Sequence, residues 1–151
     1  MSFESLLRER VIERVTASPR EIAALVDVAR RDTRTAQALT ATDLDWAFVI
    51  AYNAVLQLSI AYMYSLGFRP RNESKHYNTF RFISEALPED AGQVRRLQSI
   101  RRKRNVVLYE QAGVVSEKEA REVIEFSLRY YEETVGRLPA NVRPLIDRSD
   151  S

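Results

Sequence analysis

The stretch Trp46–Phe68, with the sequence WAFVIAYNAVLQLSIAYMYSLGF, decides the fold because it contains no charged residue. It is long enough to cross a lipid bilayer as a helix. However, Asn53, Gln57, Ser59 and three tyrosines interrupt the apolar run, and the chain has no second stretch of this kind. A helix that is apolar on all sides is typical of the centre of a helical bundle. We therefore expect this stretch to form the buried central helix of a bundle.

The composition favours a single globular domain. The chain has 151 residues, 45% of them hydrophobic, and its few glycines and prolines (Gly 4, Pro 5) favour long helices. The absence of cysteine excludes disulfides, cysteine-ligated zinc and thiol catalysis. The N-terminus lacks the continuous apolar run of a secretory signal, so we expect a cytoplasmic protein without membrane attachment. A net charge of +2 does not by itself indicate a nucleic-acid binder.

Start and stop signals divide the chain into helices. Ser18, followed by Pro19 and Glu21, predicts a capped helix start, and Ser116, followed by Glu119, predicts another. The connections are short, which favours antiparallel neighbours. The sequence predicts an all-α, up-and-down bundle of five main helices plus a short N-terminal helix over residues 1–138, and a loosely docked or disordered tail over residues 139–151. The helices are expected at about residues 3–15, 19–39, 43–66, 75–87, 90–113 and 117–138.

Several details of this bundle can be stated residue by residue. Thr42 is expected to cap the central helix and Gly67 to end it, with residues 68–74 as a polar loop. Helical spacing assigns core positions in the helix over residues 75–87 to Tyr77, Phe80, Ile83 and Leu87. In the last helix the same spacing assigns core positions to Ala120, Ile124, Leu128, Tyr131, Val135 and Leu138.

A second distinctive stretch is Arg95–Glu110, RRLQSIRRKRNVVLYE, which holds six basic residues. At about 100° per residue, Arg104 falls in the middle of the apolar face of this helix. Arginine is rarely buried without a partner, so two interpretations are open. One is a structural role, either in a salt bridge to a neighbouring helix or with the aliphatic part of the side chain extending to water. The other is a guanidinium held in a cleft or subunit interface, where it meets a phosphate or a paired carboxylate. The apolar face consists of Leu97, Ile100, Val107 and Leu108.

The same stretch supplies most of the candidate site. Arg102, Asn105 and Tyr109 recur at i, i+3 and i+7, so they share one face, where a guanidinium, an amide and a phenol can bind a phosphate and a neighbouring hydroxyl. His76, the only histidine, is either an accessory residue of the site or a residue that bonds to backbone near a helix start. No cluster with metal-ligand spacing lies nearby, so we expect neither a metal nor another cofactor. The candidates for nucleic-acid binding are Arg101, Arg102 and Lys103.

The layout of these segments resembles the HEPN superfamily, named for its occurrence in higher eukaryotes and prokaryotes as a nucleotide-binding domain. The resemblance covers roughly Arg20 to Leu138. Its motif is an arginine, commonly followed by Asn, with a His four to six residues later; here Arg104-Asn105 matches and Tyr109 stands at the His position. The matching segments are an apolar helix ending in Gly, a loop, a His-led helix and the motif helix, which correspond to Leu58–Gly67, Arg69–Lys75, His76–Leu87 and Arg104-Asn105.

The resemblance implies a helical bundle that forms a homodimer, with the motif helices facing each other across the interface. Many members are metal-independent endoribonucleases, in which the Arg and His act on the 2′-hydroxyl and the scissile phosphate of RNA. Several are toxins that occur beside a small nucleotidyltransferase antitoxin. For this chain the resemblance implies a component of a toxin–antitoxin-like system that acts on RNA, with Arg104, Asn105 and Tyr109 as catalytic residues.

The tyrosine at the histidine position leaves other functions open. A phenol has a pKa of about 10 and is a poor general base near neutral pH, so Tyr109 is expected to orient a phosphate rather than to remove a proton. Two alternative functions are therefore open: a non-catalytic nucleotide- or protein-binding module that supports a nucleotidyltransferase, and a purely structural dimer.

Overall fold

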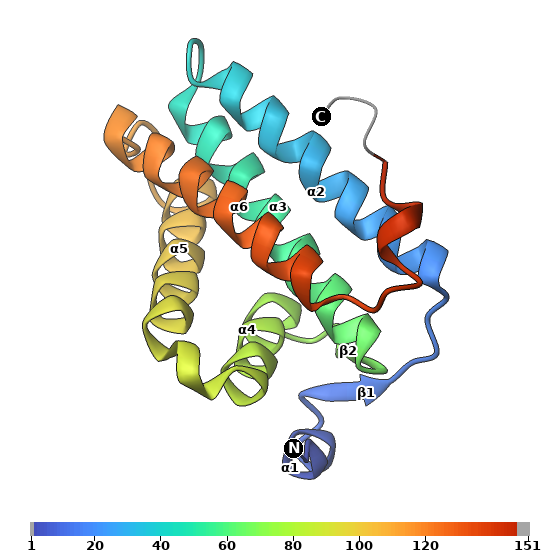
Figure 1. The fold of residues 1–151 in the computed structure, drawn as a ribbon. Helices are drawn as coiled ribbons and strands as arrows, with labels where there is room; N and C mark the ends of the chain where they lie inside the picture. The colour runs from blue at the N-terminus through green and yellow to red at the C-terminus, as the bar shows by residue number, and fades with distance from the viewer. Residues whose placement is uncertain (1, 148–151) are drawn as a thin grey trace.

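The structure of the protein, a computed structural model, describes residues 2–147 and is organised around helix α3, Leu44–Ser65 (Figure 1). Buried residues occur on every side of α3, as expected of a helix without charge in its apolar run. By length and composition α3 could cross a membrane, but 72% of its most apolar segment is buried inside the protein. That burial fits the core helix of a soluble protein.

Helices α2, Pro19–Leu39, and α6, Glu117–Arg137, both pack along α3 and also contact each other (Figure 1). Both begin with the predicted capping boxes. The hydroxyl of Ser18 accepts a hydrogen bond from the Glu21 amide at 3.1 Å and the Glu21 carboxylate accepts one from the Ser18 amide at 3.0 Å. Ser116 and Glu119 exchange the same pair of bonds at 3.0 Å each. The predicted bundle of five main helices with a short N-terminal helix is confirmed.

The ends of α3 differ in part from the prediction. Gly67 follows the helix with φ +89°, a conformation that favours glycine, so the expected stop is confirmed. The prediction that Thr42 caps α3 is wrong. The cap is Asp43, which has an extended backbone and whose carboxylate accepts a hydrogen bond from the Trp46 amide at 3.1 Å. The Thr42 hydroxyl points back instead and donates to the carbonyl of Leu39 at 3.4 Å.

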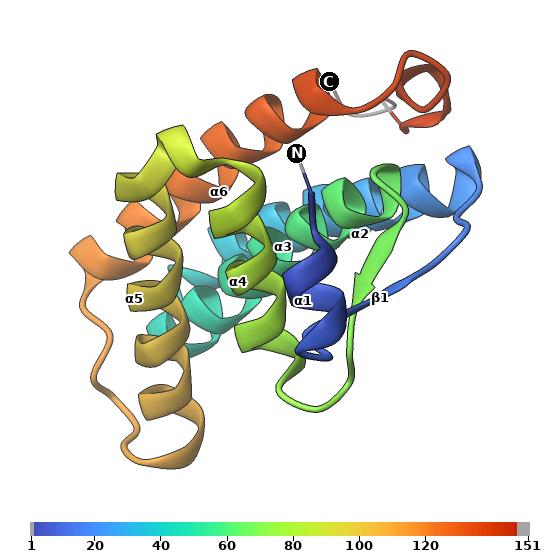
Figure 2. The ribbon, with the colours of Figure 1, turned by 90° about the horizontal axis from the view of Figure 1, so that it is seen from below.

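Helices α4, Lys75–Ala86, and α5, Ala91–Tyr109, form a hairpin against α3, joined by the short 3₁₀ helix η1, Pro88–Asp90 (Figure 2). The expectation that α5 extends to about Gly113 is wrong, because the chain leaves the helix after Tyr109. The carboxylate of Asp45 on α3 accepts hydrogen bonds from the amides of Gly113 at 2.7 Å and Val115 at 3.4 Å. These bonds hold the loop between α5 and α6 against the start of α3.

The N-terminal segment also differs from the prediction, which was a helix over residues 3–15. Helix α1 covers only Glu4–Arg8, and a strand β1, Ile12–Arg14, pairs antiparallel with β2, Phe68–Pro70, inside the expected loop. Arg10 has φ +61°, a left-handed conformation that ends the helix, and the β-branched residues that follow favour a strand. The rings of Phe3, Phe68 and Phe82 pack together beside this ribbon, with centroids 4.6–5.8 Å apart.

The segment after α6 is docked rather than loose, so that expectation is wrong for residues 139–147. It contains the 3₁₀ helix η2, Arg143–Leu145, and buries the side chains of Val142 and Ile146. The guanidinium of Arg143 donates to the carbonyl of Leu138 at 2.9 Å, and the amide of Asp147 donates to the Asp27 carboxylate at 2.8 Å. The remainder of the expected tail, residues 148–151, lies outside the described residues.

The prediction of a core position is wrong for two residues, Tyr77 and Leu128. Tyr77 is 44% exposed, because only the side of α4 that carries Phe80 and Ile83 faces the core. Leu128 is 45% exposed and lies with Tyr131 and Val135 along a groove of about 440 Å³ between α2 and α6. The buried face of α6 is rotated from the predicted stripe and comprises Ala120, Val123, Ile124, Phe126, Ser127, Tyr130 and Thr134.

Candidate functional site

Arg104 lies on the apolar face of α5 and forms no ion pair with another residue between positions 2 and 147. Its guanidinium carbon lies 5.5 Å from the ring centre of Tyr52 and 5.8 Å from that of Tyr109. Within residues 2–147, its only hydrogen bond runs from Nη1 to the side-chain oxygen of Asn105 at 3.1 Å, and its buried Nε has no partner. The salt-bridge interpretation of Arg104 is therefore wrong. Two tyrosine rings hold a guanidinium whose positive charge no carboxylate of the described chain neutralises.

Tyr52 connects Arg104 to His76. It projects from the middle of α3, its side chain is 1% exposed, and its hydroxyl lies 2.8 Å from Nδ1 of His76, the second residue of α4. The rings of Tyr52 and His76 are stacked, with centroids 5.6 Å apart and planes inclined by 27°. The fold thus brings the only histidine of the chain next to the arginine of the candidate motif.

Burial and neighbouring charges determine the ionisation of these groups. Burial raises the pKa of Tyr52 well above its ordinary value, although the positive charges of Arg104 and Arg101 act in the opposite direction. Burial, and after it the positive charges of Arg104, Lys75 and Arg101, together lower the pKa of His76 to about 4. At pH 7 the Tyr52 hydroxyl is therefore protonated, and His76 is neutral.

A neutral His76 has two tautomers, and the 2.8 Å contact is compatible with both. If the Tyr52 hydroxyl donates to Nδ1, then Nε2 carries the proton and can donate a hydrogen bond to a phosphate. If Nδ1–H donates to the Tyr52 oxygen, then Nε2 has a free lone pair and can accept a proton from a hydroxyl. The first tautomer suits binding, and the second suits general base catalysis.

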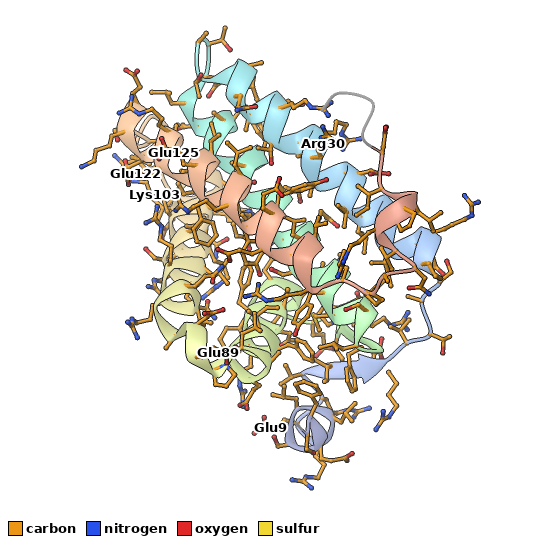
Figure 3. All side chains as sticks on the ribbon, in the orientation of Figure 1. Glu9, Arg30, Glu89, Lys103, Glu122 and Glu125 are labelled. Atoms are coloured by element: carbon orange, nitrogen blue, oxygen red, sulfur yellow. The ribbon has the colours of Figure 1, made fainter. Side chains whose placement is uncertain are left out.

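The other three basic candidates, Arg101, Arg102 and Lys103, lie in different environments. The guanidinium of Arg101, one turn before Arg104, lies 5.7 Å from the ring centre of Tyr77, and its Nε donates to the side chain of Gln98 at 2.8 Å. Arg102 is exposed. Lys103 lies at the junction of α5 and α6 (Figure 3), where it donates to the carbonyl of Val114 at 3.0 Å and pairs with Glu119 at 3.1 Å. Its amino group therefore connects two helices.

The structure thus brings together four of the predicted candidates: Arg101, Arg104, Asn105 and His76. Tyr109 borders the group as a side chain that is 74% exposed. Tyr52 was missed by sequence reasoning. The only signal of Tyr52 in the sequence is its hydroxyl within a largely apolar helix. A buried hydroxyl needs a hydrogen-bond partner, but the sequence does not show which residue that partner is.

Among residues 2–147, no three His, Asp or Glu side chains lie close enough together to hold a metal ion. The chemistry open to the site is therefore that of two guanidinium groups, an imidazole and phenols. Comparison of the chain with protein-family models, curated proteins and solved structures finds no match. The function has to be inferred from the geometry of the site.

Proposed function

We propose that this chain is a HEPN-type, metal-independent endoribonuclease of a cytoplasmic toxin–antitoxin-like system, with Arg104 and His76 acting on an RNA phosphodiester. One observation carries the proposal: the partly buried guanidinium of Arg104 forms no ion pair within the described chain and is held beside a neutral histidine. A structural arginine at such a position is normally paired with a carboxylate. An arginine that serves a ligand needs a free positive charge.

Phosphate binding follows from the arrangement of the two arginines. Arg101 and Arg104 lie one turn apart on α5, and neither forms an ion pair within residues 2–147. Guanidinium groups bind phosphate through charge-assisted hydrogen bonds, and Nη2 of Arg104 is neither buried nor hydrogen-bonded in that part of the chain. The exposed ring of Tyr109 can stack on a base of a bound RNA, because every base offers a flat π-face.

Cleavage would proceed by attack of the 2′-oxygen on the adjacent phosphorus. Nε2 of neutral His76 accepts the proton of the 2′-hydroxyl as the new P–O2′ bond forms. Arg104 stabilises the negative charge that develops on the phosphate oxygens, where electrostatic catalysis is strongest. The P–O5′ bond then breaks, and the leaving oxygen takes a proton from water. The products are a 2′,3′-cyclic phosphate and a 5′-hydroxyl, so the step needs no metal and no oxidant.

The test is cleavage of RNA in EDTA by the wild type and by variants. We expect Arg104→Ala to lower the rate about 100-fold or more, because it removes the stabilisation of the transition state. His76→Gln is expected to lower the rate by about 100-fold through the loss of the base. Arg129→Gln is a charge-matched control, because Arg129 is an exposed residue of α6, and this variant should cleave like the wild type. Activity that disappears in EDTA, or that persists in Arg104→Ala, would contradict the mechanism.

A second candidate function is a non-catalytic RNA- or nucleotide-binding module that supports a small nucleotidyltransferase. The Tyr52 hydroxyl favours it, because His76 is the only hydrogen-bond partner of that hydroxyl within residues 2–147. A hydroxyl that donates to Nδ1 leaves a proton on Nε2, and the imidazole then donates instead of accepting. In this case RNA binding should weaken steeply with added salt and depend on Arg101 and Arg104, while the wild type leaves the RNA intact.

We further propose that the protein acts as a homodimer through α5. The support is the exposure of Tyr77 and Tyr109, two large side chains that border the arginines of this helix. Aromatic residues and arginines are enriched in protein interfaces, where they contribute much of the binding energy. Sedimentation at micromolar concentration measures the oligomeric state directly. A monomer under these conditions would contradict the dimer without bearing on the phosphate site.

A further inference from the structure

Tyr52 contacts both His76 and Arg104 from the protein core. It belongs to the central helix α3, and its side chain is 1% exposed, so it can reach a bound RNA only through other residues. Its hydroxyl lies 2.8 Å from Nδ1 of His76 on α4, and its ring centre lies 5.5 Å from the guanidinium carbon of Arg104 on α5. It therefore touches side chains from two different helices at once.

We propose that Tyr52 is a positioning residue of this site, which fixes the imidazole of His76 through its hydroxyl and the guanidinium of Arg104 through the face of its ring. The inference rests on the proposed function for what the site binds. It adds a residue that the HEPN motif does not contain and that lies on the helix central to the fold.

The hydroxyl determines the orientation and the tautomer of His76. A histidine ring has two nitrogen atoms, and the one that forms a fixed hydrogen bond decides which atom faces the ligand. Among the described residues, the hydroxyl of Tyr52 is the only hydrogen-bond partner of the His76 ring. Loss of this hydroxyl should leave Nδ1 without a protein partner, and both tautomers should then become populated.

The ring determines the position of Arg104. Because Nε of Arg104 is buried and has no hydrogen-bond partner within residues 2–147, the guanidinium needs another favourable contact at this depth. The face of an aromatic ring supplies one, since it carries partial negative charge. The ring of Phe80 packs edge-on against Tyr52 with centroids 6.0 Å apart, which restricts the rotation of Tyr52. Arg104 is thereby supported by the packed core on one side, in addition to its contact with the exposed ring of Tyr109.

The two contacts can be separated by substitution. Tyr52→Phe removes the hydroxyl but keeps the ring beneath Arg104, whereas Tyr52→Leu removes both. Tyr130→Phe is a matched control, because Tyr130 is also buried and its hydroxyl lies 2.8 Å from the hydroxyl of Ser59 in the core. His76 is the only histidine, so its ring ¹⁵N resonances report the tautomer without ambiguity. Affinity is measured with a fluorescent single-stranded RNA in EDTA.

In the wild type we expect one dominant tautomer of His76. Tyr52→Phe should show a mixture of tautomers and bind RNA up to about tenfold more weakly, as for the loss of one hydrogen bond. Tyr52→Leu should bind more weakly still, and Tyr130→Phe should match the wild type in both measurements. An unchanged tautomer in Tyr52→Phe would overturn the inference even if the wild type cleaves RNA. If the tautomer changes in Tyr52→Phe but the wild type neither binds nor cleaves RNA, Tyr52 still positions His76 and the proposed function fails instead.

Discussion

Replacing Arg104 by Gln should raise the pKa of His76. In the wild type that pKa is lowered to about 4, first by burial of the ring and then by the positive charge of Arg104. The guanidinium carbon of Arg104 lies 5.5 Å from the ring centre of Tyr52, and the His76 ring centre lies 5.6 Å from the same point. The two groups are therefore at most about 11 Å apart, whatever the angle between them, which permits an estimate of their repulsion.

At this separation and an effective dielectric constant of about 20, two unit charges repel by about 1.5 kcal/mol, and salt reduces that value. One pKa unit corresponds to about 1.4 kcal/mol, so the pKa of His76 in Arg104→Gln should rise to about 5. It should stay below the ordinary 6.5, because burial, the largest cause of the lowering, is unchanged. Arg129→Gln removes the same charge from α6 and should leave the pKa of His76 unaltered.

The assay is an NMR titration of the His76 ring from about pH 8 down to about pH 2.5, which extends below the expected pKa, and the single histidine needs no assignment by mutation. A wild-type pKa near 6.5 would refute the described environment of the ring. An Arg104→Gln variant whose titration coincides with that of the wild type would refute the proximity of Arg104 to His76. Either result would also remove the physical basis for a neutral base beside an unpaired guanidinium.

The same lowered pKa makes stability depend on pH. The unfolded chain binds a proton to His76 near pH 6.5, whereas the folded protein does so only near pH 4. The contribution to stability is therefore fully present above about pH 6.5 and is lost as the pH falls toward 4. Because the ring is only partly buried, we expect a loss of about 1 kcal/mol between pH 7 and pH 5, after allowance for solvent screening. His76→Gln should lack this component in urea unfolding.

Three further predictions concern the scaffold. Arg10→Gly should stabilise the protein by about 0.5–1 kcal/mol in urea unfolding, because Arg10 has φ +61°; a destabilised variant would show that its side chain matters more than its backbone. Leu97→Ala should cost about 2–5 kcal/mol in the same assay, since the side chain of Leu97 is fully buried on α5, and a cost below about 1 kcal/mol would mean that α5 packs loosely. Asp45→Ala should speed amide hydrogen exchange at Gly113 and Val115, whose amides donate to its carboxylate; unchanged exchange would show that the loop is held by other contacts.

Much of the fold could be predicted because its signals are local. The two capping boxes and Gly67 lie within a few residues of the helix ends that they determine, so helix limits could be read from the sequence. The β1–β2 ribbon could not be predicted in this way. Its strands are three residues each and lie more than fifty residues apart in the chain, so neither has a partner within its own sequence neighbourhood.

In the candidate site, too, features set within one helix could be predicted, whereas contacts between helices could not. The position of Arg104 on the apolar face of α5 was predictable from helical geometry, because that geometry depends on one helix alone. The contact between Tyr52 and His76 depends on how α3 and α4 pack, which helical spacing does not determine. Lys103 shows that a shift of one residue along a helix can change which neighbour a side chain meets. It adjoins Arg104 in sequence, but about 100° of rotation turns it toward Glu119 on α6.

The β1–β2 ribbon also has a consequence for the order of folding. Helices α2 and α3 are consecutive and form the most extensive contact between two elements of the chain, so they can associate as soon as both have left the ribosome. The strand that precedes them has to wait, since Ile12 pairs with Pro70, beyond the end of α3. The loop closed by this pairing therefore already contains a folded helical hairpin, which lowers the entropy lost on closure. Residues 12–14, which are synthesised before α2 and α3, are thus among the later ones to reach their native contacts, and they close the segment that leads into α4 and His76.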